Sequence, residues 1–282
     1  MISPEHLAFL AEFLRRRAGI ELTRQRTHLI EGRLAPVARR FGYRDVSGLL
    51  AELKHAREAL ASAVTESMTT RDSAFFRDPI VFEQFRERVL PDLLTARKDE
   101  KRIRVWSAAC AAGQEAYSLA MLLDEMKLAE FGWTIDLVAS DLSSDQIARA
   151  EEGSYSDFEV ERGVSAERLA AHFVRTASGY RVSDRLRRMV SFRTFNLLDS
   201  FGWLFDIDAV FCRNVLMFFA DRIKLEAVHK ISEILAPDGV LVLGHAEHVA
   251  GLHRHFARHA VAGFYTPKSS GKAGQQTLAQ IA

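Results

Sequence analysis

Residues 103–141 read IRVWSAACAAGQEAYSLAMLLDEMKLAEFGWTIDLVASD and combine two short apolar runs with one helical segment between them. The runs IRVWSA and TIDLVASD have the length of buried strands, and EAYSLAMLLDEM repeats its apolar residues at helical spacing. The same alternation continues in SSDQIARAEEG, IDAVFC, RIKLEAVHKISEIL and VLVLGH. Alternating strands and helices imply parallel strands joined by crossover helices, so the sequence predicts a doubly wound, mostly parallel α/β sheet.

The chain before this region reads as helices only, from about residue 3 to residue 95. Ser3–Pro4 and Asp78–Pro79 each combine an N-cap residue with a proline suited to the first helical position. Gly19 follows three arginines, which is typical of a helix end. An amphipathic stretch then runs from Thr23 to Gly42.

The change of pattern predicts the domain organisation. We expect a helical domain at residues 1–90 and the α/β domain at residues 91–267. Within the latter, RTASGYRVSD (175–184) breaks the alternation and reads as a short inserted hairpin. The last residues, 268–282, are small and polar and are expected to be disordered.

The bulk composition excludes several classes of protein. The 282 residues carry 38 Lys and Arg against 37 Asp and Glu, whereas a dedicated nucleic-acid binder normally shows a basic excess. Cys110 and Cys212 are too few for a disulfide framework and are expected to be reduced. The N-terminus lacks the pattern of a signal peptide, and no apolar run has the length of a bilayer span. We therefore expect a cytoplasmic protein that is not inserted in a membrane and binds no nucleic acid.

Small or polar residues follow the predicted strands, and ligands of open parallel sheets bind beyond the carboxyl ends of the strands. The first strand is followed by SAACAAGQE (107–115). Its small residues would let a ligand lie against the backbone, and Gly113 permits a tight turn. A plain strand-to-helix connection would use the same residues.

Three further segments at strand ends have two interpretations each. Asp141 can bind a ribose hydroxyl, or it can cap the next helix unless Ser143 or Ser144 does so. Asn196–Leu197 can read the edge of a nucleobase, or its amide can serve an ordinary turn. Arg213–Asn214 directly follows a buried strand, so both side chains need either a ligand or partners in the loop backbone.

Signatures of other cofactors are missing from the sequence. It contains neither the Gly-x-Gly-x-x-Gly fingerprint of a dinucleotide site nor a Gly-Lys-Ser/Thr phosphate loop. No His and Cys residues are spaced like metal ligands, so we expect no metal site.

Five ordered segments resemble the signature blocks of the CheR methyltransferases: MTTRDSAFFR (68–77), WSAACAAGQEAYSLAM (106–121), FNLL (195–198), FCRNVLMFF (211–219) and LVLGHAE (241–247). The resemblance extends over residues 5–266. It implies a class I S-adenosylmethionine (SAM)-dependent methyltransferase sheet with an all-helical N-terminal domain and a small β-subdomain inserted at about 158–190. It also implies the activity, which is methyl transfer from SAM to glutamate side chains of methyl-accepting chemotaxis receptors, with S-adenosylhomocysteine (SAH) as the product.

The resemblance also implies roles for single residues. Arg77 corresponds to the arginine that faces the SAM carboxylate and the active site, and it is the expected catalytic residue. Ser73 keeps the hydroxyl of a usual threonine, and Glu115 corresponds to the glutamate at the amino end of the cofactor. The other expected cofactor contacts are Asp141 at the ribose, Asn196 and Leu197 at the adenine, and Arg213 and Asn214 closing the pocket.

The chain departs from the family pattern at four positions. Arg71 replaces an asparagine, Ala116 a proline, Ala246 a serine, and Phe218 a tyrosine beside the transferred methyl group. The lost tyrosine hydroxyl is expected to weaken positioning without removing an essential base. Two alternatives therefore stay open: a SAM- or SAH-binding regulatory module with reduced or lost catalysis, and a methyltransferase that acts on another protein or a small molecule.

The N-terminal helices are rich in arginine, with nine arginines and two acids between residues 15 and 44. Arg26, Arg33 and Arg40 recur every seven residues and form one ridge if the helix continues past Pro36. An ordinary solvated face has the same composition. Because the resemblance implies acidic receptor helices as substrates, we expect this arginine ridge to dock the receptor.

Overall fold

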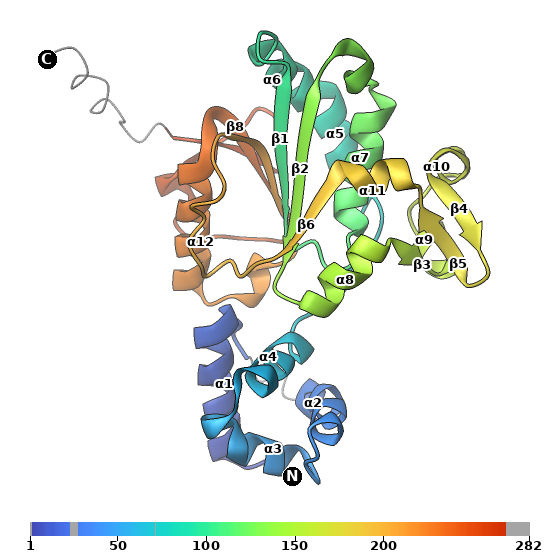
Figure 1. Ribbon diagram of the computed structural model, residues 1–282. Coiled ribbons are helices and arrows are strands. Elements are labelled where there is room, and N and C mark those ends of the chain that lie inside the picture. Colours follow the sequence, from blue (N-terminus) through green and yellow to red (C-terminus); the bar gives the residue numbers. More distant parts are fainter. Residues whose placement is uncertain (1, 23–27, 71, 269–282) are drawn as a thin grey trace, which may run out of the picture.

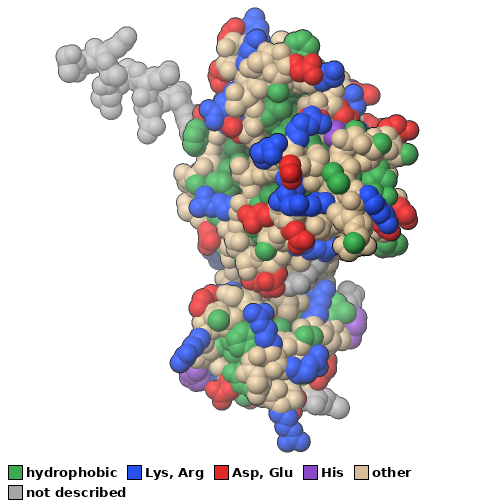
Figure 2. Space-filling view, turned by 45° about the vertical axis from the view of Figure 1, so that its right-hand side comes forward, with side chains coloured by type: hydrophobic (Ala, Val, Ile, Leu, Met, Phe, Trp, Pro, Cys, Tyr) green, Lys and Arg blue, Asp and Glu red, His purple; other side chains and the backbone are tan. Residues whose placement is uncertain are grey.

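A computed structural model describes residues 2–22, 28–70 and 72–268 of the chain. The N-terminal residues form a helical body, and the rest of the chain forms a larger body around a sheet (Figure 1). The space-filling view shows a narrow waist between the two bodies (Figure 2). In the described ranges no helix is long and apolar enough to cross a membrane. The predicted tail lies outside these ranges from residue 269 onward.

The helical body is formed by α1 (Pro4–Ala18), α2 (His28–Arg40), α3 (Val46–Glu52), the turn η2 (Leu53–His55) and α4 (Glu58–Ser67). α1 begins as predicted, because the Ser3 hydroxyl accepts the backbone N–H of His6. It ends at Gly19, whose φ of 71° is left-handed and therefore favours glycine. α2 continues through Pro36, as the arginine ridge requires. Buried apolar side chains of these helices form a core of their own.

The larger body contains a seven-stranded sheet with the strand order β6-β2-β1-β7-β8-β10-β9. Its strands are β1 (Arg102–Ala108), β2 (Thr134–Asp141), β6 (Val190–Thr194), β7 (Ile207–Cys212), β8 (Leu235–Leu243), β9 (Phe256–Arg258) and β10 (Phe264–Pro267). The first five strands in the spatial order are parallel, whereas β10 runs antiparallel to β8 and β9. Strand order reverses between β1 and β7, which is the position where such sheets bind ligands. The predicted doubly wound, mostly parallel sheet is confirmed.

The two faces of the sheet bury separate apolar clusters, because successive side chains of a strand point to opposite faces. Ile103 and Val105 of β1 belong to one cluster, and Trp106 and Ala108 belong to the other. The first cluster lies under α7 (Gln114–Glu125), and the second lies under α12 (Asp221–Ile234) (Figure 1). Burial on both faces explains why the strands read as continuous apolar runs.

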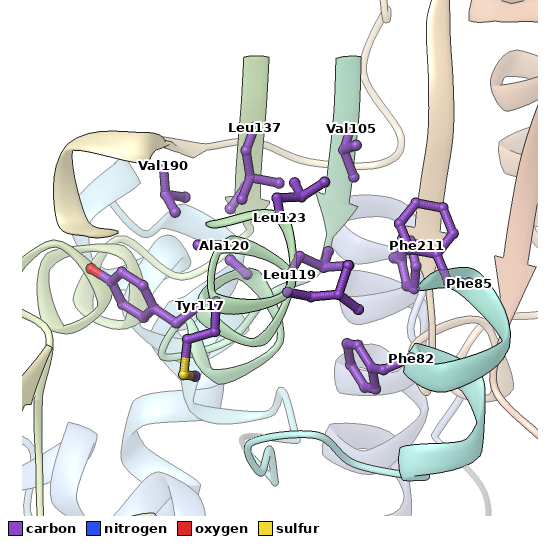
Figure 3. Close-up of a cluster of buried hydrophobic side chains, with 14 of the residues drawn as sticks. Phe82, Phe85, Val105, Tyr117, Leu119, Ala120, Leu123, Leu137, Val190 and Phe211 are labelled. Atoms are coloured by element: carbon purple, nitrogen blue, oxygen red, sulfur yellow. The ribbon is translucent and has the colours of Figure 1, made fainter. Parts of the chain in front are cut away.

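A helical segment before β1 packs on the sheet rather than on the helical body. It consists of α5 (Pro79–Gln84), the π-helical turn η3 (Phe85–Val89) and α6 (Leu90–Ala96). The rings of Phe82 and Phe85 contact Phe211 of β7, with centroids 6.1 and 5.1 Å away (Figure 3). The expected boundary near residue 90 cuts through this segment, so we propose that the domain boundary lies before α5, near residue 70.

The small inserted β-subdomain projects from the side of the sheet body (Figure 1). It includes β3 (Ser154–Tyr155), α9 (Asp157–Glu161), α10 (Ala166–His172), β4 (Phe173–Thr176) and β5 (Gly179–Val182), followed by α11 (Asp184–Met189). The predicted hairpin is β4–β5, in which Thr176 pairs with Gly179. The third strand, β3, was not predicted, because two residues are too short to show a period.

Candidate active site

A cleft lies at the carboxyl ends of β1, β2 and β7, and residues of the helical body form part of its wall. It holds about 1060 Å³ of space including its open mouth, which suits a ligand of nucleoside size. The structure places all eight residues expected to contact a cofactor on its lining: Ser73, Arg77, Glu115, Asp141, Asn196, Leu197, Arg213 and Asn214.

The loop between β1 and α7, residues 109–113, has an unusual backbone. Ala109 and Ala111 have φ angles of 57° and 48°, a conformation that costs an L-residue about 1–3 kcal/mol. At Gly113, φ is 89°, and an added Cβ would lie 2.9 Å from the Cβ of Ala150. The turn therefore requires glycine, as predicted, and the small side chains leave the loop backbone open to the cleft.

Asp141 joins the end of β2 to this loop. Its Oδ2 accepts the N–H of Ala111 and its Oδ1 accepts the N–H of Ser143, both at 2.9 Å. Ser143, and not Asp141, is the side-chain cap of α8 (Ser144–Glu152), since its hydroxyl accepts the N–H of Gln146. Each carboxylate oxygen can accept a further hydrogen bond, so Asp141 can also bind hydroxyl groups of a ligand.

Glu115 and Arg213 form a buried ion pair at the floor of the cleft. Arg213 Nη1 donates to Glu115 Oε2 at 3.0 Å, and Ser107 Oγ donates to Glu115 Oε1 at 2.8 Å. Burial raises the pKa of the Glu115 carboxyl above its ordinary value, and the charge of Arg213 opposes this shift. The Arg213 side chain is only 1% exposed. The pair therefore forms part of the cleft floor, and Arg213 is poorly placed to attract an incoming substrate.

Asp78 has a different role from the one predicted. It stands at the N-cap position of α5, but its side chain makes no capping hydrogen bond and its φ is 59°. Its carboxylate instead accepts Arg213 Nη2 at 2.7 Å. The same Nη2 also donates to the backbone oxygen of Arg77 at 2.8 Å, so Arg213 fixes the segment that carries Arg77.

The guanidinium of Arg77 is the more accessible cation of the cleft. Its side chain is 36% exposed, and Nη1 donates to the backbone oxygen of Asp72 at 3.1 Å. The Asp72 carboxylate lies 3.9 Å away. Arg77 is thus positioned to receive a carboxylate from a ligand or a substrate.

The amide of Asn196 is occupied by backbone groups. Its Nδ2 donates to the carbonyl oxygen of Arg17 at 2.7 Å, and its Oδ1 accepts the N–H of Leu198 at 3.1 Å. The turn interpretation therefore describes its hydrogen bonds, with an added contact to the helical body. Leu197, which is buried, and Phe218 supply apolar surface to the same cleft.

Glu247 was not among the expected site residues, although it organises one wall of the cleft. Its Oε2 accepts the N–H groups of Asn214 and Gly244, both at 2.8 Å. Its Oε1 accepts those of Val215 and Met217, at 2.9 and 3.3 Å. A single carboxylate thus holds Asn214 in a left-handed conformation with φ of 59°. The signals in the sequence are an acid shortly after an apolar strand and its position at the end of the block LVLGHAE (241–247).

The helical body also contributes to the cleft, which the strand-end argument could not predict. Ala18, Ile20 and Met68 line it. Ile20 forms a β-bridge with Phe219, just after the turn η5 (Leu216–Phe218). The C-terminal end of α1 is therefore held directly against the cleft.

The three arginines of the predicted ridge differ in environment. Arg26 lies outside the described residues. Arg33 Nη1 donates to the carbonyl oxygens of Met68 and Thr69 at 2.8 and 3.0 Å, so it holds the linker that borders the cleft. Arg40 is exposed and stacks on the Phe41 ring at 5.6 Å. The docking role of this ridge stays a prediction.

Both cysteines are buried and free of disulfides. Burial raises the pKa of both thiols well above the ordinary value, so they are poor nucleophiles. Among the residues that the structure describes, no group of three or more His, Cys, Asp or Glu side chains could hold a metal ion.

The charged, polar and apolar groups of the cleft fit SAM. The Arg77 guanidinium can pair with a carboxylate, Glu115 with an ammonium group, and Asp141 with ribose hydroxyls. Apolar surface for a flat base comes from Leu197 and Phe218, and an open backbone comes from residues 109–113.

Two domain families match the chain. The family described as CheR methyltransferase, all-alpha domain, matches residues 5–69. The family described as CheR methyltransferase, SAM binding domain, matches residues 71–262. Their junction coincides with the linker between the two bodies.

Known chemotaxis methyltransferases are similar to the chain over most of their length. Chemotaxis protein methyltransferase 1 of Pseudomonas aeruginosa is 37% identical over 248 residues, which cover 86% of this chain and 90% of that protein. Chemotaxis protein methyltransferase Cher2 of Pseudomonas putida is 35% identical over 249 residues, again 86% and 90%. The chemotaxis protein methyltransferase of Escherichia coli is 31% identical over 264 residues, which cover 90% and 88%.

Proposed function

The chain belongs to the CheR family of SAM-dependent protein-glutamate methyltransferases, and we propose that the strand-end cleft is where it holds the cofactor and the receptor glutamate. Its activity is the methylation of chemoreceptor glutamates with SAM. The observation that carries the proposal is that eight residues from separate parts of the sequence line one cleft. We further propose that the protein acts in the cytoplasm and binds no nucleic acid, as its composition predicts.

The reaction asks little of acid–base chemistry. When bound, SAM supplies a methyl group that is activated by the positive charge on its sulfur. A glutamate carboxylate is already ionised near neutral pH, so no general base has to remove a proton from it. The protein therefore contributes mainly by holding the carboxylate oxygen in line with the methyl group and by excluding water.

In the proposed complex, different residues of the cleft bind the ribose, the ammonium group and the adenine of the cofactor. Asp141 binds the ribose hydroxyls while it holds the N–H of Ala111. Glu115 binds the ammonium group, and its pairing with Arg213 opposes the rise of its pKa that burial causes. Asn196 and Leu197 border the adenine, and Arg213 and Asn214 close the pocket.

Arg77 has two open roles, at the cofactor carboxylate and at the substrate carboxylate. Its partial exposure supports the second role, because a receptor glutamate has to enter from outside. Arg213 is enclosed by Glu115 and Asp78, so it serves to position the Arg77 segment.

A methyl-transfer assay with labelled SAM and receptor fragments tests the proposal. We expect label on receptor glutamates, and we expect Arg77→Ala to lower turnover strongly. Binding of SAM without transfer to any receptor fragment would favour the alternative of a regulatory module. Transfer to an unrelated protein instead would indicate a different substrate class.

A further inference from the structure

The cofactor loop 109–113 needs external ties, because its left-handed residues are strained. Two ties come from β2: the N–H of Cys110 donates to Ser140 O, and the N–H of Ala111 donates to Asp141 Oδ2, both at 2.9 Å. A third tie comes from the inserted β-subdomain. The hydroxyl of Tyr155 in β3 donates to the carbonyl oxygen of Ala112 at 2.5 Å.

This third tie is buried at both ends. Tyr155 is 3% exposed and Ala112 is 2% exposed, so water cannot replace the bond without entering the core. A buried carbonyl that loses its donor keeps the full cost of desolvation. The bond therefore fixes the position of the loop as well as adding stability.

The ring of Tyr155 contacts a second cleft segment, residues 72–78. It meets Phe75 edge-on, with centroids 4.9 Å apart, and Phe173 of β4 meets the same Phe75 ring at 5.5 Å. Gly163 also packs closely against Phe75, since an added Cβ at residue 163 would lie 1.9 Å from the carbonyl oxygen of Phe75. Phe75 is 1% exposed, so its side chain is fully enclosed by these contacts.

Residues on either side of Phe75 line the cleft. Ser73 precedes it by two positions and Arg77 follows it by two, and both face the cofactor site. The next residue, Phe76, has a left-handed φ of 47°, and its N–H donates to Ser118 Oγ at 2.9 Å. The enclosed Phe75 thus anchors a strained segment that has to present Arg77 at a defined place.

We propose that Tyr155 is a positioning residue for methyl transfer, which sets the cofactor loop with its hydroxyl and the Arg77 segment with its ring. The β-subdomain is then a supporting wall of the active site. This inference rests on the proposed function, because it takes the cleft to be the SAM site. The hydroxyl of Tyr155 should then affect mainly SAM affinity, and its ring should affect mainly turnover.

Tyr155→Phe tests the hydroxyl, and Tyr117→Phe is its matched control. Tyr117 is also fully buried, and its hydroxyl donates to a carbonyl oxygen outside the cleft, that of Ala150, at 2.7 Å. Calorimetry should show SAM affinity weakened about three- to tenfold in Tyr155→Phe and unchanged within about twofold in Tyr117→Phe. Both variants should lower the thermal midpoint, because each loses at least one buried hydrogen bond of a tyrosine hydroxyl.

Phe75→Leu tests the contact between the rings of Tyr155 and Phe75. It also keeps the inference testable if Tyr155→Phe does not fold. Turnover at saturating SAM and receptor should fall about tenfold, while SAM affinity changes less than it does in Tyr155→Phe. Wild-type SAM affinity in Tyr155→Phe, equal weakening in both tyrosine variants, or wild-type turnover in Phe75→Leu would overturn the inference. Asp141→Ala, measured alongside, tests the cleft itself, so failure of the proposed function would be recognised separately.

Discussion

Asp141 shows how one side chain serves both loop geometry and the proposed cofactor contact. Its carboxylate accepts two backbone N–H groups and still has capacity for ribose hydroxyls. We expect Asp141→Ala to weaken SAM binding about tenfold or more, through loss of a charge-assisted hydrogen bond. Calorimetry measures this directly, and an unchanged affinity would remove Asp141 from the site.

Among the departures from the family pattern that the structure describes, Phe218 lies in the cleft, whereas Arg71 lies outside the described residues. We expect Phe218→Tyr to keep or raise turnover, because it returns a polar group near the methyl position without altering the adenosine side. SAM affinity should change little. Steady-state kinetics with labelled SAM provide the test, and loss of activity on adding the hydroxyl would mean that the site is organised differently around residue 218.

At the scale of elements, local signals predicted the parallel strands, the inserted hairpin and some of the helix ends, but not the short strands β9 and β10. Ser3, Gly19 and Gly113 act as expected, because capping and tight turns depend on residues close in sequence. Asp78 has the right local pattern for a cap but pairs with Arg213, far along the chain, and this tertiary contact prevails. β3 was missed because its two residues carry no period.

The loop after β7 depends on an element that follows β8, through Glu247. Glu247→Gln keeps the size of the side chain but replaces one acceptor oxygen with an NH2 group, which cannot accept the loop N–H groups. We expect SAM affinity and turnover each to fall several-fold, because Asn214 and Val215 line the cleft.

Glu226→Gln is the control for this change. Glu226 lies exposed on α12 and pairs with the exposed Arg222 at 3.0 Å, away from the cleft lining. Calorimetry and turnover should match the wild type for this variant. Wild-type values for Glu247→Gln as well would show that the loop holds its shape without the carboxylate.

At the scale of the whole molecule, the cleft lies at the seam between the two bodies. The end of α1 reaches it through the bridge of Ile20 to Phe219, and the linker reaches it through Met68. The side chains on the face in Figure 2 include Lys and Arg interspersed with Asp and Glu over the sheet body. The receptor-docking charge is expected on residues 15–44 of the helical body, which carry nine arginines and two acids.

The arginine ridge gives a prediction about receptor encounter. Reversing Arg26 and Arg40 to Glu should raise the KM for receptor several-fold and flatten its salt dependence, because surface charges are screened within about 10 Å at ordinary salt. SAM affinity should stay intact. Arg33→Glu should in addition weaken SAM binding, since Arg33 holds the carbonyls of Met68 and Thr69 beside the cleft. An unaltered receptor KM at low salt would assign the ridge to solvent.

The sequence predicts the sheet, its ligand edge and the site residues that follow its strands, because short polar or small segments come directly after apolar runs. Ser73 and Arg77 lie before β1 and were expected only from the family resemblance. The contacts that support these site residues could not be predicted from the sequence. Glu247, Tyr155 and the carbonyl of Arg17 act through partners that only the folded chain brings near. The boundary that we propose near residue 70 was not evident in the sequence for the same reason. The segment of α5, η3 and α6 has the same helical pattern as the preceding helices, and only the contacts of Phe82 and Phe85 with Phe211 place it on the sheet.

Mass spectrometry of chemoreceptors after incubation with this protein and SAM tests the central claim most directly. We expect peptides that carry one added methyl group on a glutamate side chain, formed by the wild type and strongly reduced with Arg77→Ala. SAM binding by the wild type with no methylated receptor peptide would contradict it.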